Sequence, residues 1–369
     1  MKTKVFAALT AALALGLSLG GCGSGASGTT DKRAESKPGG QNVEIHGAGA
    51  TFPAPLYAKW IAEYNNAQQN VKLDYQAIGS GGGIKGITDR TVQFGASDGP
   101  MTDEQLKEAS AKNGGDKIVH LPTLAGPDVI IYKLEGVSDL VLDGETIAHI
   151  YLGKITKWND PKIAKLNKAA LPDKDIVVAH RSDGSGTTWI FTNYLCKVSP
   201  EWSKSAGNAT SVKWPVGIGG KGSDGVAAAV NNSDGGIGYV ELAYVENAKL
   251  SCAAVVNKAG KAVKPTIDGV NEAAKNSAEI PDDFRISITD APGDASYPIS
   301  GYTYLLVYED LSYLKNKALA SEMLKFIEWC ENNGQDMAAP GYARLSKELQ
   351  QKVAEKLKTI KFDGEPIEK

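Results

Sequence analysis

The sequence predicts an α/β protein with about two domains. Segments with the apolar patterns of strands and of helices alternate along most of the chain, as in a sheet covered by helices. The chain has 369 residues, and this length suggests about two domains with sizeable cores, since a domain typically holds about 150 residues. The formal net charge of −3 argues against a nucleic-acid-binding surface.

The first residues are typical of a secretion signal. Two lysines precede an apolar stretch that is too short to span a bilayer. Residues 19–22, Leu-Gly-Gly-Cys, look like a bacterial lipobox, which predicts a signal peptide at 1–21 and acylation of Cys22. The alternative is ordinary cleavage that removes Cys22 or leaves its thiol unmodified. Residues 22–42 hold few apolar side chains and are expected to form a flexible tether.

The first helix is predicted at 56–64, where large apolar residues four positions apart form one stripe. Prolines stand just before it, and proline suits the first turn of a helix because its missing N–H would have had no partner there. Thr51 and Phe52 therefore lie at a helix N-terminus with exposed backbone donors.

A strand at 74–78 then runs into a glycine-rich segment, 79–83. Four glycines around Ser80 would let the backbone wrap a small ligand, with the serine hydroxyl as a donor. A flexible loop explains the same glycines. The next strand, 92–97, ends at Asp98 beside a Gly-Pro pair, a place where aspartate most often serves as a turn or cap residue.

Residues 181–188, Arg-Ser-Asp-Gly-Ser-Gly-Thr-Thr, carry the strongest local signal for a ligand. They lead into a helical pattern at 189–195, so Ser185, Gly186 and Thr187 are predicted at the helix N-terminus. There, unpaired N–H groups and the positive end of the helix dipole favour an anion.

Arg181 can add a forked pair of donors to the same anion, and Asp183 is placed to hold its guanidinium still. A glycine-rich turn with a serine N-cap explains the segment without any ligand. The nucleotide-binding pattern GxxxxGK[ST] is not matched, because no lysine follows the second glycine.

The rest of the chain continues the alternation. Strands are predicted at 129–132, 175–179, 236–240 and 299–308. Helices are predicted at 144–152, 222–231, 319–332 and 346–359.

Together these segments resemble the family of periplasmic phosphate-binding proteins, the substrate receptors of high-affinity phosphate ABC importers. The resemblance rests on blocks such as GAGATFPAPLYAKW, IGSGGGIKGI, FGASDGPMTDEQL and RSDGSGTTWIFTNYL. Seven blocks occur in the same order, at 47–60, 78–87, 94–106, 140–160, 181–195, 212–228 and 237–244. The chain departs from the family in an insert at 107–116, in three cysteines, and in a stretch around 267–292 that does not align.

The resemblance implies a two-lobed, type II periplasmic binding protein fold. Each lobe would be a mixed β-sheet flanked by helices, and two hinge crossings would join the lobes. Lobe I would comprise 43–125 plus 299–369, and lobe II 126–298. The crossings would fall near 124–127 and 297–301.

The resemblance also implies the ligand residues. Thr51, Phe52, Ser80, Arg181, Ser185, Gly186 and Thr187 would donate hydrogen bonds to phosphate. Asp98 would be the acceptor carboxylate, and Asp183 would support Arg181 as its ion-pair partner.

The implied function is binding of inorganic phosphate in the periplasm or cell envelope and its delivery to the permease and ATPase subunits of an ABC importer. The protein would be a monomer, held at the membrane by its lipid, with no cofactor, no metal and no nucleic-acid partner. A receptor for sulfate or molybdate is the closer alternative, and Asp98 is the residue that separates the two. A phosphate-ester hydrolase is the more distant alternative, because the four histidines are scattered and make no metal-ligand spacing.

Apart from Cys22, three cysteines remain, an odd number for an oxidising compartment. Cys330 lies one helical turn after Phe326 and is expected to be buried. If a disulfide forms, it joins Cys196 and Cys252, which both fall in lobe II. The wide spacing of the cysteines argues against a metal site.

Overall fold

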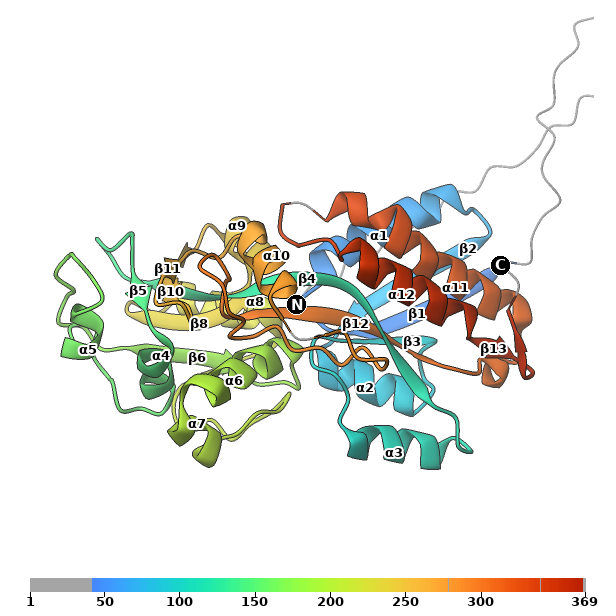
Figure 1. The fold of residues 1–369 in the computed structure, drawn as a ribbon, viewed down its shortest axis with the longest axis horizontal. Helices are drawn as coiled ribbons and strands as arrows, with labels where there is room; N and C mark the ends of the chain where they lie inside the picture. The colour runs from blue at the N-terminus through green and yellow to red at the C-terminus, as the bar shows by residue number, and fades with distance from the viewer. Residues whose placement is uncertain (1–41, 278, 339, 368–369) are drawn as a thin grey trace, which may run out of the picture. The chain divides into compact units, whose positions relative to one another are not determined.

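A computed structural model describes residues 42–277, 279–338 and 340–367. A mixed β-sheet of nine strands runs through the described chain, and helices cover it on both sides (Figure 1). The α/β prediction is confirmed. The predicted signal peptide at 1–21, the acylated Cys22 and the tether as far as residue 41 lie outside the described residues.

The first half of the sheet places three parallel strands beside one antiparallel strand. The strands are β1 (Val43–Gly49), β2 (Val71–Ala77), β3 (Phe94–Ser97) and β12 (Ser300–Tyr308). The helices around them are α1 (Ala54–Ala67), α2 (Ser80–Thr88), α3 (Asp103–Lys112), α11 (Lys317–Asn332) and α12 (Lys347–Lys358). Short elements complete this half: η1 (Ser312–Leu314), η2 (Gly334–Met337), β13 (Lys361–Phe362) and β14 (Glu365–Pro366).

The second half continues the same sheet. Its strands are β4 (Ile118–Lys133), β6 (Val177–Arg181), β7 (Ile218–Gly220), β8 (Gly236–Glu241) and β9 (Ser251–Cys252). A separate small sheet holds β5 (Val141–Leu142), β10 (Ala254–Val256) and β11 (Ala262–Val263). The helices are α4 (Gly144–Tyr151), α5 (Pro161–Ala164), α6 (Gly186–Val198), α7 (Pro200–Ser205), α8 (Gly222–Asn231), α9 (Leu242–Ala248) and α10 (Ile267–Lys275).

Strand β4 belongs to both halves. The strand order is β2-β1-β3-β12-β4-β8-β6-β7, and β9 pairs with β4. Strand β4 pairs with β12 from Ile118 to Pro127 and with β8 from Asp128 to Lys133. All its residues except Lys133 are buried, as expected of a strand covered on both faces. The change of partner between Pro127 and Asp128 marks the point where the chain passes from one half to the other.

Local sequence explains where several helices begin. Thr102 and Gln105 form a capping box at the start of α3, each side chain accepting from the other residue's backbone N–H. Ser185 caps α6 by accepting the backbone N–H of Thr188. Pro53 precedes α1 without any side-chain cap, and its ring already fixes the φ angle of the turn.

One glycine-rich segment differs from the sequence expectation. The sequence left open whether residues 79–83 wrap a small ligand or form a flexible loop, but α2 already begins at Ser80. A Cβ atom on Gly83 would lie 2.5 Å from the carbonyl oxygen of Ala96, and one on Gly81 would lie 3.0 Å from the Cα atom of Gly184. These glycines therefore let the first turn of α2 approach neighbouring backbone closely, rather than forming a loop.

Aromatic side chains fill both halves of the core. Tyr57 stacks on Trp60 in the first half, with ring centroids 5.2 Å apart. Phe191 stacks on Tyr239 in the second half, with ring centroids 4.4 Å apart. Such aromatic pairs stabilise a fold by about 0.5–1.5 kcal/mol in addition to the stabilisation that comes from burying their apolar area. The Tyr239 hydroxyl points from this core toward Arg181 and accepts the backbone N–H of that residue at 3.2 Å.

The cysteines of the described chain are all free thiols. Cys330 is fully buried in α11, as predicted, and burial raises its pKa well above the ordinary value. Cys196 and Cys252 are partly exposed and unbonded, so the disulfide considered for them is not formed in this structure.

Glu331, at the end of α11, is a buried carboxyl group without a hydrogen-bond partner among the described residues. Its residue is 4% exposed, and neither carboxylate oxygen finds a donor. Burial raises its pKa well above the ordinary value, so the folded protein holds a proton that the unfolded chain releases above a pH of about 4.3. Because the folded protein keeps this proton and the unfolded chain releases it, the free energy of unfolding falls as the pH rises from about 4.3 toward the pKa of Glu331 in the folded protein.

We therefore expect Glu331→Gln to stabilise the fold at pH 7. The amide has a similar shape and never ionises, so the gain should be about 1 kcal/mol or more, because one pKa unit corresponds to about 1.4 kcal/mol. Thermal melts at pH 7 and pH 4 measure the effect, and the gain should shrink at pH 4. The exposed Glu63→Gln serves as the control and should not change the melting temperature. Equal stability of Glu331→Gln and wild type at both pH values would contradict this account.

Candidate functional site

The predicted ligand residues gather at the carboxyl ends of parallel strands. Thr51 follows β1, Ser80 follows β2, Asp98 directly follows β3, and Arg181 ends β6. In an open α/β sheet this edge is the usual ligand position, because the strand–helix turns open toward it. We call the junction between the loops after β1, β2 and β3 and the N-terminus of α6 the seam.

The two halves of the sheet touch directly at the seam. The backbone N–H of Gly186 donates to the Ser80 hydroxyl at 2.9 Å, and the N–H of Gly81 donates to the carbonyl oxygen of Gly184 at 2.9 Å. Ser80 is fully buried. A Cβ atom on Gly186 would clash with both the backbone and the side chain of Asp98. Glycine at this position is therefore what allows the start of α6 to reach Asp98.

Arg181 is the buried cation of the seam. Its residue is 3% exposed, and its Nε and Nη2 donate to the two carboxylate oxygens of Asp183 at 2.8 and 2.6 Å. Its Nη1 has only long contacts, at 3.4 Å to the hydroxyls of Thr187 and Ser223. One edge of the guanidinium is thus held in a bidentate pair, while Nη1 remains available for a further acceptor.

Asp183 accepts the backbone N–H of Gly222 at 3.0 Å in addition to the guanidinium. Burial alone would raise the pKa of Asp183, but its hydrogen bonds to Arg181 and the charge of Arg181 outweigh burial and hold the pKa below its ordinary value. The predicted supporting role therefore has a matching geometry, with Asp183 ionised and Arg181 immobilised.

Asp98 is the buried carboxyl group opposite the start of α6. Its residue is 2% exposed, and its Oδ1 has no hydrogen-bond partner among the described residues. Burial raises the pKa of Asp98 to about 7, against the opposing effects of the nearby Thr303 hydroxyl and of the Arg181 charge. Near neutral pH such a group is present in both its protonated and its ionised form, and the ionised form can accept a hydrogen bond from a ligand.

Thr51 and Phe52 are held at the seam by hydrogen bonds with side chains from other parts of the chain. The Thr51 hydroxyl lies 2.9 Å from the Ser223 hydroxyl, and the Thr51 carbonyl oxygen accepts from Tyr244 at 3.0 Å. Phe52 is fully buried, and its carbonyl oxygen accepts from the Tyr342 hydroxyl at 2.7 Å. These tyrosines hold the backbone ahead of α1, which orients its N–H groups.

The N-terminus of α6 supplies fewer unused donors than the sequence suggested. The backbone N–H of Ser185 donates to the carbonyl oxygen of Thr210 at 2.7 Å, and the N–H of Gly186 is taken by Ser80. The Ser185 hydroxyl accepts from Thr188 and still has its own proton to donate. Thr187 is 1% exposed, with its hydroxyl on the Arg181 side.

Sequence reasoning missed three buried polar residues at the seam. Ser223, in the first turn of α8, lies between Thr51 and Arg181. Asp128 and Glu241 are fully buried carboxyl groups on the paired strands β4 and β8. The sequence did contain one signal, because Asp128 and Glu241 each stand in a run of apolar strand residues. A carboxyl group buried in such a run needs a hydrogen-bond partner or must retain its proton.

No histidine takes part in this arrangement. The ring of His180 stacks on Trp214 at 4.8 Å and contacts the carbonyl oxygen of Arg181 rather than its guanidinium. Within the described ranges, no group of three or more metal-ligating side chains lies together.

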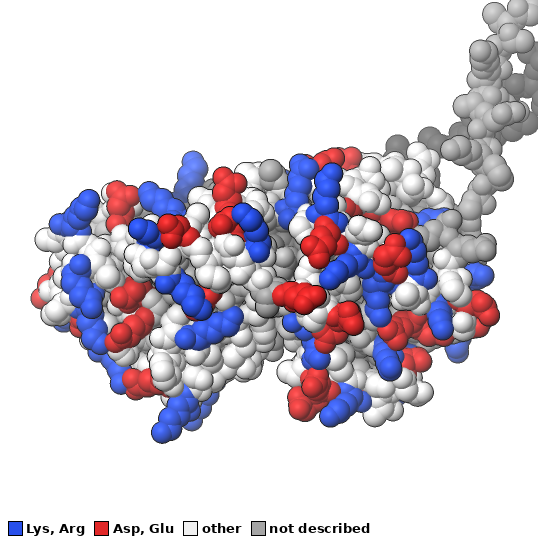
Figure 2. Space-filling model, viewed as in Figure 1, with Lys and Arg blue, Asp and Glu red and all other residues white. Residues whose placement is uncertain are grey.

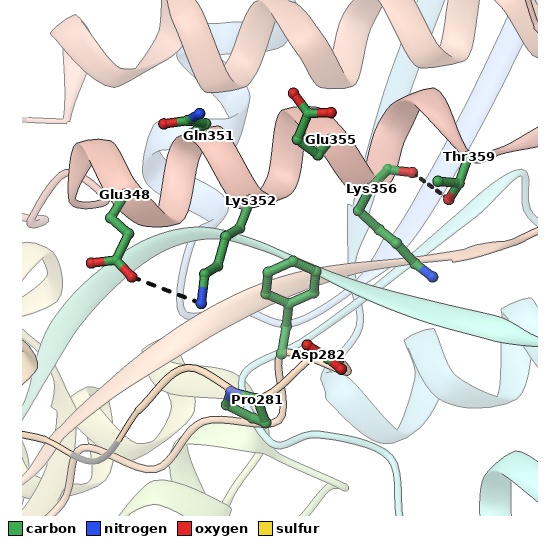
Figure 3. Close-up of a pocket in the computed structure, with 9 residues that line it drawn as sticks. Pro281, Asp282, Glu348, Gln351, Lys352, Glu355, Lys356 and Thr359 are labelled. Atoms are coloured by element: carbon green, nitrogen blue, oxygen red, sulfur yellow. Dashed lines mark hydrogen bonds and ion pairs between the residues drawn. The ribbon is translucent and has the colours of Figure 1, made fainter.

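A surface groove elsewhere contains none of the predicted ligand residues. This groove of about 490 Å³ lies between α12 and the segment 281–284 (Figure 3). Glu348 and Lys352, on its α12 side, form an ion pair of 3.8 Å. Basic and acidic side chains are interspersed over the face shown in Figure 2. The enclosed groups of the seam, rather than a broad surface potential, are therefore the candidate anion site.

Comparison with known proteins gives consistent results. A model of the PBP superfamily domain matches residues 26–332. The phosphate-binding protein PstS of Pasteurella multocida is 42% identical over 86% of this chain and 91% of its own length. The phosphate-binding protein PstS of Methanocaldococcus jannaschii is 36% identical over 90% of this chain and 89% of its own length.

Two solved structures have the same fold at low sequence identity. A high affinity periplasmic phosphate-binding protein (PfluDING), bound with phosphate, superposes with a TM-score of 0.69 at 21% identity, covering 85% of this chain and 93% of that chain. A putative phosphate ABC transporter substrate-binding protein from Clostridium perfringens, with bound phosphate, has a TM-score of 0.60 at 20% identity, covering 82% of this chain and 100% of that chain. The two-lobed fold expected from the sequence is confirmed.

Proposed function

The chain belongs to the PstS phosphate-binding proteins of the PBP superfamily, and on this premise we propose that it binds inorganic phosphate at the seam and delivers it to an ABC importer. The observation that carries this proposal is the enclosed group of Arg181, Asp98 and the start of α6. A fixed cation edge, neutral donors and one proton acceptor suit a small tetrahedral anion that still carries a proton. Phosphate is the ligand, and binding requires no cofactor.

We assign phosphate binding to the predicted set, with Asp183 in support of the arginine. The set is Thr51, Phe52, Ser80, Asp98, Arg181, Ser185, Gly186 and Thr187. Burial of these side chains supports the assignment, because preorganised donors in a dry site lose little energy to reorganisation. The backbone N–H groups of Ser185 and Gly186 already donate hydrogen bonds within the protein. They contribute to phosphate binding through the dipole at the N-terminus of α6.

The lobe boundaries remain our proposal: 43–125 plus 299–369 for lobe I, and 126–298 for lobe II. The change of β4 from β12 to β8 between Pro127 and Asp128 supports a crossing there. Opening at β4 and β12 would break the contacts between Ser80 and Gly186 and let phosphate enter or leave.

Asp98 favours phosphate over sulfate or molybdate. Near neutral pH, phosphate can donate a proton to a buried carboxylate, whereas sulfate is fully ionised and would meet the carboxylate with a bare oxygen. A phosphate-ester hydrolase fits less well, because the seam holds no histidine and no activated nucleophile. We therefore assign a transport role and no catalytic one.

We further propose a monomer in the periplasm or cell envelope, anchored through an acylated Cys22 and docking onto the permease and ATPase subunits of the importer. The lipobox-like sequence at 19–22 supports the anchor. In the part of the chain that the structure describes, no helix combines the length and apolarity needed to span a bilayer.

Asp98→Asn should weaken the discrimination between phosphate and sulfate. The amide can donate to a sulfate oxygen, so sulfate binding should gain about tenfold or more relative to phosphate, the scale of one hydrogen bond to a charged group. Calorimetric titration of both anions measures this ratio. The exposed Asp268→Asn is the control and should keep the wild-type ratio. Undiminished exclusion of sulfate by a stably folded Asp98→Asn would show that Asp98 only caps the strand end.

Arg181→Lys should bind phosphate about tenfold to a hundredfold more weakly although the charge is kept. Lysine cannot pair with both oxygens of Asp183 and at the same time present a second donor edge to the ligand. Equilibrium titration with phosphate measures the loss. Arg344→Lys, on the surface, is the matched control. An unchanged dissociation constant for Arg181→Lys would place the arginine outside the binding site.

The mature N-terminus should begin at an acylated Cys22. Mass spectrometry of the membrane fraction should find lipid on this residue, and Cys22→Ser should release the protein into the soluble fraction. Cys196→Ser, in the folded part, should remain anchored. Detection of an unmodified Cys22 in membrane-bound protein would rule out the lipid anchor.

A further inference from the structure

Glu241 and Asp128 form a cross-strand pair beside the proposed phosphate site. They are directly opposite residues on the antiparallel strands β8 and β4, so their side chains share one face of the sheet. Both are fully buried, and three of their four carboxylate oxygens have no partner among the described residues. The fourth, Oε2 of Glu241, lies 3.1 Å from the Ser223 hydroxyl.

Ser223 continues this contact as a chain of hydroxyl groups. Its oxygen lies 2.9 Å from the hydroxyl of Thr51 and 3.4 Å from Nη1 of Arg181. A hydroxyl group donates one hydrogen bond and accepts up to two. The single proton of Ser223 can therefore go to Glu241 or to Thr51 but not to both.

The protonation state of Glu241 decides between these two directions. An ionised Glu241 can only accept, so Ser223 would donate to it, and the Thr51 proton would turn toward Ser223. A protonated Glu241 can donate to Ser223. Ser223 then donates to Thr51, and the Thr51 proton points toward the ligand.

We propose that Glu241 is a positioning residue for phosphate binding: its proton sets the direction of the Glu241–Ser223–Thr51 chain so that the Thr51 hydroxyl donates to the anion. This inference rests on the proposed function. Glu241 acts through the two hydroxyl groups and does not touch phosphate itself. A charge on Asp128 would further oppose ionisation of Glu241, since two ionised carboxylates on directly opposite buried residues repel strongly.

The surrounding charges agree with a protonated Glu241. Burial raises its pKa well above the ordinary value, and the nearby Asp98 and Asp128 act in the same direction, against the opposing charge of Arg181. Burial likewise raises the pKa of Asp128 well above its ordinary value. The hydroxyls of Tyr244 and Tyr342 also lie near Glu241.

Substitutions of Glu241 separate a carboxyl group that can ionise from side chains that cannot. Glu241→Gln is a permanently neutral donor to Ser223, and Glu241→Met offers Ser223 no competing acceptor, so Ser223 stays free to donate to Thr51 in both variants. Titration calorimetry of the full chain with inorganic phosphate at pH 7 should therefore find both variants within about threefold of wild type. As the pH rises toward 10 and Glu241 ionises, wild type should lose about tenfold or more in affinity relative to Glu241→Gln, the scale of one hydrogen bond to a charged group. In a Ser223→Ala background, this difference between wild type and Glu241→Gln should fall to within about threefold.

The controls distinguish this inference from a general loss of stability. Glu331→Gln and Glu331→Met alter another buried, unpartnered carboxyl group and should leave phosphate affinity unchanged. Thermal melts without phosphate confirm that each variant folds. An affinity ratio of wild type to Glu241→Gln that stays constant between pH 7 and pH 10, or that changes as much in the Ser223→Ala background, would overturn the positioning role. Failure of the wild-type chain to bind phosphate would instead overturn the proposed function, and this inference with it.

Discussion

The burial of the Arg181 guanidinium is the constraint on which the rest of the seam depends. A cation removed from water must be met by well-placed acceptors, or the desolvation cost exceeds what its contacts return. Asp183 meets it with two hydrogen bonds of 2.8 and 2.6 Å and is itself held by Gly222. With one edge occupied in this way, the guanidinium has a fixed orientation, and its Nη1 lies beside the hydroxyls of Thr187 and Ser223, at 3.4 Å from each. An anion placed there meets a charge that does not have to reorient.

The sheet brings these groups together by changing partners in the middle of one strand. Because β4 pairs with β12 up to Pro127 and with β8 from Asp128 onward, the carboxyl ends of two sets of parallel strands face each other. The close approach also needs small residues. Gly186 leaves room for Asp98, and Gly81 and Gly184 let two backbones form a hydrogen bond across the seam. A side chain at either contact would separate the donors that a small anion must reach at the same time.

In the function that we propose, the positions of protons give the site its selectivity. In its ionised form, the buried Asp98 carboxylate would offer an acceptor that only a protonated oxyanion can satisfy. On our proposal, the hydroxyl chain from Glu241 through Ser223 would likewise give the Thr51 hydroxyl one direction in which to donate. A dry site makes both features effective, since water cannot supply a missing donor or acceptor. The same burial raises the pKa values of Asp128 and Glu241 well above their ordinary values.

The sequence by itself determined the features that depend on near neighbours in the chain. Prolines before α1, the serine cap of α6 and the spacing of Arg181 and Asp183 act within a few residues, so strands, helix starts and most of the candidate ligand residues were predictable from it. Only the tertiary structure decided which distant residues meet. Ser223 contacts Thr51 across 172 positions, and Glu241 lies opposite Asp128 because of strand register. A residue's sequence neighbours cannot reveal such partners, since burial, like the protons it retains, is a property of the whole packed sheet.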